Sequence, residues 1–478
     1  MDYGDVSTLG GLNHLTAIEI AGLIRARDVS PVEVLQAHLD AITRLNPTVN
    51  AICTLATERA MTSAREAEAA VMRGEPLGPL HGLPIGIKDV TLTAGIRTTY
   101  GSPLYADYVP NEDAAVVARL VQAGAIVLAK TNTPEFAAGG NTVNKLFGAT
   151  RNPWNLSSTV GGSTGGGAAA LACGMIALAE GTDFGGSLRV PATFCGVVGL
   201  RPTAGLVPSY PVTLPWDIGR VHGPMARSVE DVALMLDAMI GLSDLSPISL
   251  LPPWTSAAER FASHRRGKAL RLAYAPDIAD VGVDAEIEQI CGTAARDLAN
   301  SEIKVDESRF SLADGRDPYL VLRGQWMVSQ YFDYLHKLDQ LGANLKVNIE
   351  YGLKLTTKDL AAAEHVRAQL WNRCRALFHD FDLLLTPTVP IPPFPIEQNY
   401  PQMIAGRQVA TYIDWVAPTF LITLCGLPAA SVPCGLTGTG LPVGLQVVGP
   451  RYAEPQILSL AKLIQDMRPI GRPPITRT

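Results

Sequence analysis

Charged residues are scarce in this chain. They make up 18% of its 478 residues, whereas hydrophobic residues make up 47%, and the formal net charge is −6. Intrinsically disordered chains are richer in charge and poorer in apolar residues, so this composition indicates a globular protein. Binding to a nucleic-acid backbone requires a basic surface, which a net negative balance does not favour. We therefore expect no nucleic-acid partner.

The chain also lacks closely spaced cysteines, a secretory signal and an uninterrupted apolar run. No two of its seven cysteines stand two or three positions apart, as zinc and dithiol motifs require. Met1–Leu15 has no basic segment followed by an apolar stretch. Val416–Pro450 is free of charge, but prolines and glycines divide it into runs shorter than the roughly 18 apolar residues of a membrane span. We expect a cytoplasmic protein without a membrane segment, and buried strands joined by tight loops in Val416–Pro450.

The first 75 residues are predicted to be helical. Capping boxes begin at Thr16 and Ser30, and the second helix is expected to stop at Asn46-Pro47. A third helix is predicted over Thr57–Arg73. In residues 76–240, helices alternate with short apolar strands such as Leu83–Ile87, a pattern typical of an α/β sheet covered by helices on both faces.

Residues 241–380 are more polar and only weakly patterned, and apolar runs typical of strands resume at Leu383, Ala430 and Val443. We predict one domain over residues 1–478, made of N-terminal helices (1–75), a catalytic core (76–240), a helical insertion (241–380) and C-terminal strands that complete the sheet (381–478).

Two glycine-rich segments each lead to a serine. Gly161–Gly167 contains Ser163, and Gly185-Gly186 directly precede Ser187. So many glycines are costly unless the backbone must approach something closely or adopt positive φ. Glycines before a nucleophile leave backbone N–H groups free to converge on one point, as an oxyanion hole requires. The two segments therefore favour serine-based acyl transfer.

A serine hydroxyl needs a neighbouring base before it becomes an effective nucleophile. Lys88 ends the apolar run Leu83–Ile87, and a lysine buried among apolar residues can be neutral at physiological pH. Lys88 is therefore our candidate base, whereas Lys130 is interpreted as structural.

Several motifs together resemble the amidase signature family of serine hydrolases. The resemblance covers most of residues 15–240 and about 380–465. The motifs are His81–Asp89, Lys130–Phe136, Asn152–Asn155, Gly161–Pro208, Gly426–Ala430 and Pro442–Gln446. It implies a large mixed β-sheet and hydrolysis of C–N bonds in amides through an acyl-enzyme, without a metal or cofactor.

Matching positions in the family assign roles to individual residues. Ser187 matches the nucleophile, Lys88 the base, and Ser163 the bridging serine that follows a cis peptide bond. The backbone N–H groups of the oxyanion hole match Phe184, Gly185, Gly186 and Ser187. Asp183 and Arg189 are expected to hold this loop by a charge-assisted pair. Phe184 stands where the family more often has a small or β-branched residue, so we expect it to narrow or reshape the acyl pocket.

The sequence leaves the substrate open. We predict that the substrates are small-molecule amides of hydrophobic or aryl type, and carbamates and esters are further candidate substrates. The protein is expected to be a monomer or homodimer. The predicted pocket walls are Tyr319, Trp326, Tyr331, Tyr412 and Trp415.

Three alternatives remain open at this point. An α/β-hydrolase would use Ser163 in Gly161–Gly165 as the nucleophile of a G-x-S-x-G elbow, and it needs a histidine. The available histidines are His222, His264, His336, His365 and His379. A phosphate-binding loop would require Lys and Ser or Thr after Gly167, where Ala168 stands. The third alternative is a non-catalytic scaffold or a protein similar to the A subunit of the glutamyl-tRNA amidotransferase.

Overall fold

The computed structural model describes residues 11–258 and 270–477, and its centre is a single 11-stranded sheet. The strands of this sheet are β1 (Ile52–Leu55), β2 (Pro84–Lys88), β3 (Ile126–Thr131), β8 (Leu178–Asp183), β9 (Val198–Arg201), β10 (Val221–Ala226), β11 (Leu270–Tyr274), β12 (Ile303–Glu307), β13 (Leu383–Pro387), β16 (Ala429–Leu436) and β17 (Pro442–Val448). Their order is β1-β3-β2-β8-β10-β9-β16-β17-β13-β11-β12. Parallel pairs (β3-β2-β8 and β13-β11-β12) flank a middle run of antiparallel pairs, and the edge strand β1 pairs antiparallel with β3. The predicted large mixed sheet is confirmed.

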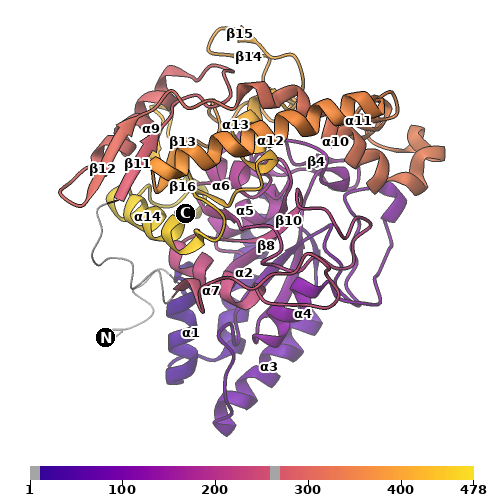
Figure 1. Ribbon diagram of the computed structural model, residues 1–478. Helices are drawn as coiled ribbons and strands as arrows, with labels where there is room; N and C mark the ends of the chain where they lie inside the picture. The colour runs from indigo at the N-terminus through magenta and orange to yellow at the C-terminus, as the bar shows by residue number, and fades with distance from the viewer. Residues whose placement is uncertain (1–10, 259–269, 478) are drawn as a thin grey trace.

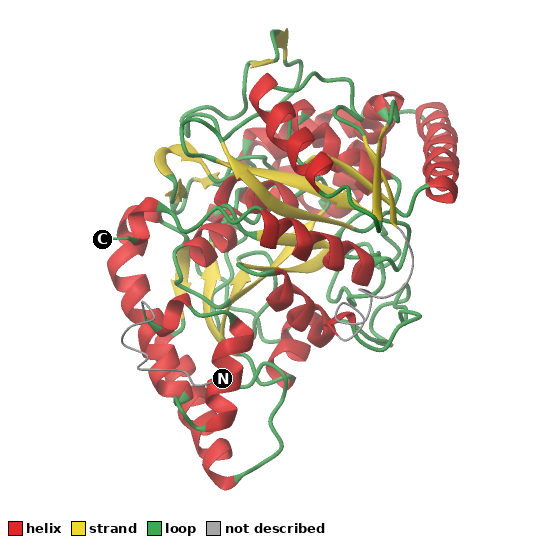
Figure 2. Ribbon diagram, turned by 90° about the vertical axis from the view of Figure 1, so that its left-hand side faces the viewer, coloured by secondary structure: helices red, strands yellow, loops and turns green. Residues whose placement is uncertain are grey.

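Helices cover both faces of the sheet, as predicted, and Figure 2 shows them on either side of the strands. One face is covered by α1 (Ala17–Ala26), α4 (Ala115–Gln122), α7 (Val229–Met239), α9 (Ala285–Asp297) and α14 (Glu454–Met467). The other face is covered by α2 (Pro31–Val49), α3 (Thr57–Arg73), α5 (Gly165–Ala172), α6 (Arg189–Cys195), α12 (Thr357–Asp380) and α13 (Ala417–Leu424). Strand alternation explains this arrangement: in β3, Val127 faces the first layer, whereas Ile126 and Leu128 face the second.

Three smaller antiparallel pairs and two further helices lie outside this framework. They are β4 (Val143–Asn144) with β5 (Gly148–Ala149), β6 (Arg151–Asn152) with β7 (Asn155–Thr159), β14 (Met403–Ile404) with β15 (Arg407–Gln408), α10 (Arg316–Gln330) and α11 (Ala343–Gly352). In Figure 1 helices α10, α11 and α12 lie in the upper part of the molecule, whereas α1 and α3 extend at its lower end.

Both predicted capping boxes are present, at Thr16 and Ser30, but α2 does not stop at Asn46-Pro47. The helix continues to Val49, because a proline in the last turn removes only one backbone donor. The Asn46 side chain then closes the helix end by accepting bonds from the N–H groups of Ala51 and Ile52.

The segment 241–380 is not a purely helical insertion, because it contributes strands β11 and β12 to one edge of the sheet. Edge strands are partly exposed, and in β12 only Ile303 is buried, which explains why the sequence carries so weak a strand pattern. The C-terminal strands β13, β16 and β17 correspondingly lie inside the sheet, between β9 and β11. All four predicted segments supply strands to this sheet; the assignment of one domain stays a prediction.

The uncharged segment Val416–Pro450 begins with the buried helix α13 and continues into strands β16 and β17. The prediction of buried strands is therefore correct only for its second part. Among the described residues, no helix is both long and apolar enough to cross a membrane.

Candidate active site

The site lies where the parallel strands β2 and β8 end side by side. Lys88 is the last residue of β2, and its side chain is fully buried. Its Nζ lies 2.7 Å from Ser163 Oγ and 3.0 Å from the hydroxyls of both Thr164 and Thr182. Because Ile87 pairs with Glu180, the ends of the two strands bring Lys88 next to Thr182. The structure thus joins the predicted base directly to the predicted bridging serine.

Burial lowers the pKa of Lys88 to about 7, an effect that the charge of Arg220 reinforces and that of Glu180 opposes. A large fraction of this amine is therefore neutral near neutral pH. A neutral amine has two hydrogens and one lone pair. Its hydrogens can be donated to Thr164 and Thr182, which leaves the lone pair to accept the hydroxyl hydrogen of Ser163. Neither threonine stands out in the sequence as a support of the lysine.

Glu180 lies behind the lysine and is itself paired. Its carboxylate is 2.7 Å from Nδ1 of the buried His222 and also accepts bonds from Thr91 Oγ1 and the Lys88 N–H. Burial acts to raise the pKa of Glu180, but His222, Thr91 and Lys88 outweigh burial and hold it below its ordinary value. This carboxylate is therefore charged, and it is shared among three partners.

Ser163 sits in the loop before α5, and the peptide bond from Gly162 to Ser163 is cis, as the family resemblance implies. The glycines around it permit close backbone approach. A Cβ at Gly166 would lie 2.3 Å from the Asn132 nitrogen, and one at Gly162 would lie 2.7 Å from the Gly139 oxygen. The glycine-rich sequence is therefore a packing requirement of this loop.

Ser187 lies in the short loop between β8 and α6. Gly186 has φ of 109°, and a Cβ there would lie 2.1 Å from Thr419 Oγ1, so both the conformation and the space require glycine. Thr419 Oγ1 also donates to the Gly185 carbonyl. Ser163 and Ser187 line the same pocket, together with Thr182.

The Gly186 N–H is not available for the predicted oxyanion hole. It donates to Oδ1 of Asp183 at 3.1 Å, because the turn folds back onto this carboxylate. Among the described residues, the N–H groups of Phe184, Gly185 and Ser187 have no such partner. These three backbone N–H groups are therefore the ones left for an oxyanion, whereas the Gly186 N–H stabilises the turn through its bond to Asp183.

Asp183 and Arg189 make a buried bidentate salt bridge, with contacts of 2.9 and 3.1 Å. Arg201 adds a weaker contact at 3.4 Å. Burial acts to raise the pKa of Asp183, but the two guanidinium groups outweigh it and hold the pKa well below its ordinary value. Arg189 also donates to side chains or carbonyls at Thr419, Thr423 and Gln446, so its guanidinium fixes the serine loop to α13 and β17.

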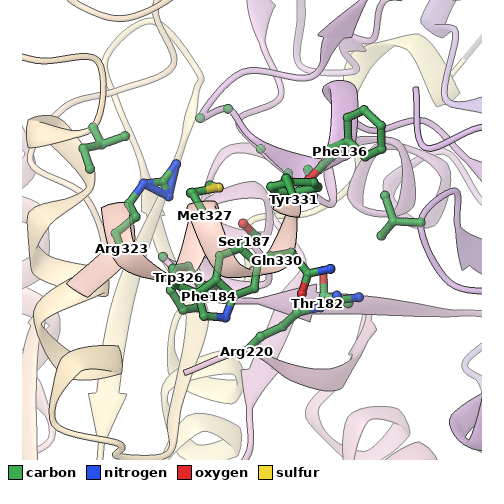
Figure 3. Close-up of a pocket in the computed structure, with 18 of the residues that line it drawn as sticks. Phe136, Thr182, Phe184, Ser187, Arg220, Arg323, Trp326, Met327, Gln330 and Tyr331 are labelled. Carbon is green, nitrogen blue, oxygen red and sulfur yellow. The ribbon is translucent and has the colours of Figure 1, made fainter. Parts of the chain in front are cut away.

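The pocket has a volume of about 290 Å³ and many aromatic side chains in its walls, and helix α10 contributes several of the lining residues. Figure 3 shows Trp326, Tyr331 and Phe184 around Ser187. Of the predicted walls, Tyr319, Trp326, Tyr331 and Tyr412 line it. Phe184 stacks on Trp326 with ring centroids 4.5 Å apart, so this residue shapes one side of the pocket. Further aromatic walls that sequence reasoning missed are Tyr100, Tyr105, Phe136, Tyr334 and Phe420.

Trp415 does not line the pocket. Its side chain is fully buried, stacks on Phe194 at 5.8 Å and meets the edge of Phe394 at 5.2 Å. The turn at residues 414–416 directs it into the core, and Ile413 and Val416 line the pocket in its place.

The other candidates from the sequence are occupied elsewhere. Lys130 is buried but bonds Thr91, Thr93 and Thr98, and it has no contact with either serine. No histidine lines the pocket within residues 11–258 and 270–477, and His264 lies outside the described residues. The described chain also brings together no group of three or more His, Cys, Asp or Glu side chains able to hold a metal ion.

Comparisons with known proteins identify the family of this chain. Residues 33–458 match the amidase family. An acylamidase from Rhodococcus erythropolis is 35% identical over 464 residues, covering 96% of each chain. The A subunit of the glutamyl-tRNA(Gln) amidotransferase of Moorella thermoacetica is 35% identical over 481 residues, covering 94% of this chain and 96% of the relative.

Solved structures give the same result. A bacterial aryl acylamidase of the amidase signature family superposes with a TM-score of 0.86 at 27% identity, covering 95% of this chain and 96% of that one. A 6-aminohexanoate cyclic dimer hydrolase, solved with its substrate, gives 0.87 at 28% identity, covering 97% and 99%. The chain therefore belongs to the amidase signature family and is an enzyme that hydrolyses amides.

Proposed function

We propose that Ser187 attacks the amide carbonyl and forms an acyl-enzyme, with Ser163 and Lys88 as the proton relay. Neutral Lys88 takes the proton of Ser163, and Ser163 takes the proton of Ser187 as the new C–O bond forms. The oxyanion is stabilised by free N–H groups of the loop, drawn from Phe184, Gly185 and Ser187, at about 3–4 kcal/mol for a strong donor. Ser163 then returns a proton to the nitrogen of the leaving amine, and the C–N bond breaks.

Hydrolysis of the acyl-enzyme follows the same path in reverse. Water takes the position that the amine has left, gives a proton to Ser163, and attacks the acyl carbonyl. Ser187 leaves with a proton returned through Ser163. The observation that carries this proposal is the 2.7 Å contact between Ser163 Oγ and the Nζ of a fully buried lysine whose pKa is near 7.

We further propose that the substrates are small hydrophobic or aryl amides, with carbamates and esters as weaker substrates. Stacked rings such as Phe184 and Trp326 favour planar apolar groups over small polar ones. The similarity to an acylamidase and to an aryl acylamidase supports the same class.

The test combines trapping with a substrate panel. The purified enzyme is mixed with acyl anilides, primary amides, aryl carbamates, aryl esters and glutamine, and intact mass is recorded after rapid acid quench. We expect anilides to be the best substrates and an acyl adduct to map to Ser187. Alanine at Ser187, Ser163 or Lys88 should each remove the adduct. An adduct on Ser163, or full turnover by Ser187→Ala, would contradict the mechanism.

A second candidate is a glutamine-hydrolysing component of an amidotransferase, which the similarity to the Moorella protein supports. Such a component hydrolyses glutamine for a partner, so glutamine turnover should be strong and should increase with that partner. If glutamine exceeds every anilide in kcat/KM, this second function replaces the first.

A further inference from the structure

The pocket wall contains an arginine that is almost fully buried. Arg323, on α10, is only 6% exposed and lines the pocket together with Tyr319 and Met327 of the same helix face. Its Nε donates to Asn348 Oδ1 at 3.1 Å, and its Nη2 donates to the Tyr412 hydroxyl at 2.6 Å. Its position is therefore fixed by two neutral groups.

The supports of Arg323 are themselves held in place. Asn348 Nδ2 donates to the same Tyr412 hydroxyl at 2.6 Å and to the Asn344 carbonyl at 2.6 Å. The guanidinium carbon lies 5.9 Å from the centre of the Tyr412 ring, within the range of a cation–π contact. A guanidinium that is rigidly positioned before the ligand arrives loses little entropy on binding it.

What Arg323 lacks is a counter-ion. Within the described residues it makes no salt bridge, and its Nη1 has no hydrogen-bond partner, whereas Arg189, buried beside the serine loop, is paired with Asp183. A buried charge without a partner is costly. A ligand carboxylate would supply the opposite charge and accept charge-assisted hydrogen bonds from the guanidinium.

The remaining charges of the pocket also favour an anion. Arg220 lines it as a second cation: its charge adds to the effect of burial in lowering the pKa of Lys88, and it opposes the rise that burial causes in the pKa of Tyr331. The single acidic lining residue among those described is Asp333, which is exposed. Figure 3 shows Arg323 and Arg220 on different sides of Ser187.

We propose that the substrate is an amide that carries a carboxylate, and that Arg323 binds this carboxylate as its counter-ion. The inference rests on the proposed amide hydrolysis at Ser187 and narrows its substrate class to hydrophobic or aryl amides that also carry a carboxylate. Arg323 acts on binding and orientation and takes no part in proton transfer.

The test uses matched pairs of substrates in which only the charge differs. Succinanilate and valeranilide place the carboxylate or an apolar end on the acyl side. Para-acetamidobenzoate and para-nitroacetanilide place a carboxylate or a neutral isostere on the amine side. For each substrate, kcat/KM of Arg323→Met is divided by that of the wild type, so that intrinsic reactivity cancels.

We expect Arg323→Met to lower kcat/KM about 10- to 100-fold more for one anionic substrate than for its neutral partner, since a charge-assisted contact is lost. The pair that responds identifies the side of the scissile bond on which the carboxylate lies. Arg323→Lys should lose less activity on the anionic substrate than Arg323→Met does, because lysine keeps the positive charge but lacks the paired N–H donors of the guanidinium. Arg220→Met is the comparison variant, and it should discriminate less between the members of a pair.

Equal losses on both members of each pair would show that Arg323 is structural and would overturn the proposal. A selective loss in Arg220→Met but not in Arg323→Met would also overturn it. Binding of succinanilate and para-acetamidobenzoate to Ser187→Ala, measured by calorimetry, separates this proposal from the proposed function. If the wild type hydrolyses none of the amides, yet binding of one anion to Ser187→Ala disappears when Arg323→Met is added, the hydrolysis mechanism fails and the anion site stands.

Discussion

The ring of Phe184 lies stacked on the ring of Trp326, with centroids 4.5 Å apart and planes 26° from parallel. Trp326 is in turn anchored by a bond from its Nε1 to Asp217 Oδ2 at 2.9 Å. The same two rings also line a second hollow of about 170 Å³, next to Trp216 and Leu322. With Tyr319 and Arg323, which also line both spaces, the stack forms the shared wall between the two.

Phe184→Ala should join these spaces and change the preferred substrate size. We expect the ratio of kcat/KM for hexananilide to that for acetanilide to rise about 10-fold, which corresponds to room for about two of the additional methylenes at about 0.8 kcal/mol each. Phe332→Ala is the control, because this ring is 68% exposed and lies outside the stack. An unchanged ratio would mean that the stack does not limit substrate size.

The activity should depend on pH through Lys88. Its pKa is lowered to about 7, and only the neutral amine can accept a proton, so kcat/KM should rise as pH increases through about 7 and then level off. Lys88→Arg, which stays protonated, should lose about 10²- to 10⁴-fold, the usual contribution of a general base. A profile of kcat/KM from pH 5 to pH 9 with a neutral anilide tests this, and a fall with rising pH would assign the base elsewhere.

Thr182 should matter through the lysine it holds. Thr182→Val keeps the shape but removes the acceptor 3.0 Å from Lys88 Nζ. Loss of such a hydrogen bond costs about 0.5–1.5 kcal/mol, so we expect kcat to fall about 2- to 10-fold with KM little altered. Thr386→Val is a matched control: its buried hydroxyl has no partner among the described residues, so kcat should stay at the wild-type value.

Asp183 should stabilise the fold as well as the serine loop. Asp183→Asn leaves Arg189 and Arg201 buried without their counter-ion, which should cost about 3–5 kcal/mol in free energy of unfolding. Urea denaturation at pH 7 measures this loss. Asp237→Asn is the comparison variant, because the half-buried Asp237 carboxylate accepts bonds from the N–H groups of Ala257 and Ala258 and pairs with no buried arginine within the described residues. If Asp183→Asn lowers the free energy of unfolding no more than Asp237→Asn does, that result contradicts the role assigned to Asp183.

The pKa of Asp183 also fixes the sign of a pH effect on stability. Because the folded-state pKa is depressed, its contribution is present above the unfolded value of about 3.9 and is lost as pH falls from there towards the folded pKa. The wild type should therefore lose more stability than Asp183→Asn when the pH is lowered from about 5 to 2. If the free energy of unfolding falls by the same amount in both proteins over this pH range, the depressed pKa of Asp183 is refuted.

Much of this arrangement was predictable from local sequence patterns. Lys88, Ser163 and Ser187 stand in motifs, and the structure brings the first two into contact and both serines into one pocket. The capping boxes at Thr16 and Ser30 were predictable because a cap depends on residues only three positions apart.

Features that depend on distant parts of the chain were not predictable. Trp415 and Tyr412 are equally aromatic in the sequence, but only the packing of the turn against Phe194 decides which of them enters the core. The Gly186 N–H looks free in the sequence, but the folded turn gives it Asp183 as an acceptor. Arg323 is significant only because no acidic side chain of residues 11–258 and 270–477 makes a salt bridge with it, and a sequence cannot show that a partner is missing.

The many bonds of Arg189 have a consequence for how the enzyme becomes active. This guanidinium fixes the serine loop to Thr419, Thr423 and Gln446, which lie more than 200 positions later in the chain. During synthesis, a ribosome-bound chain that has emerged only as far as Ser187 lacks these anchors. The loop that carries Ser187 is thus anchored only after Thr419, Thr423 and Gln446 have been made, so a chain truncated before Thr419 should be hydrolytically silent.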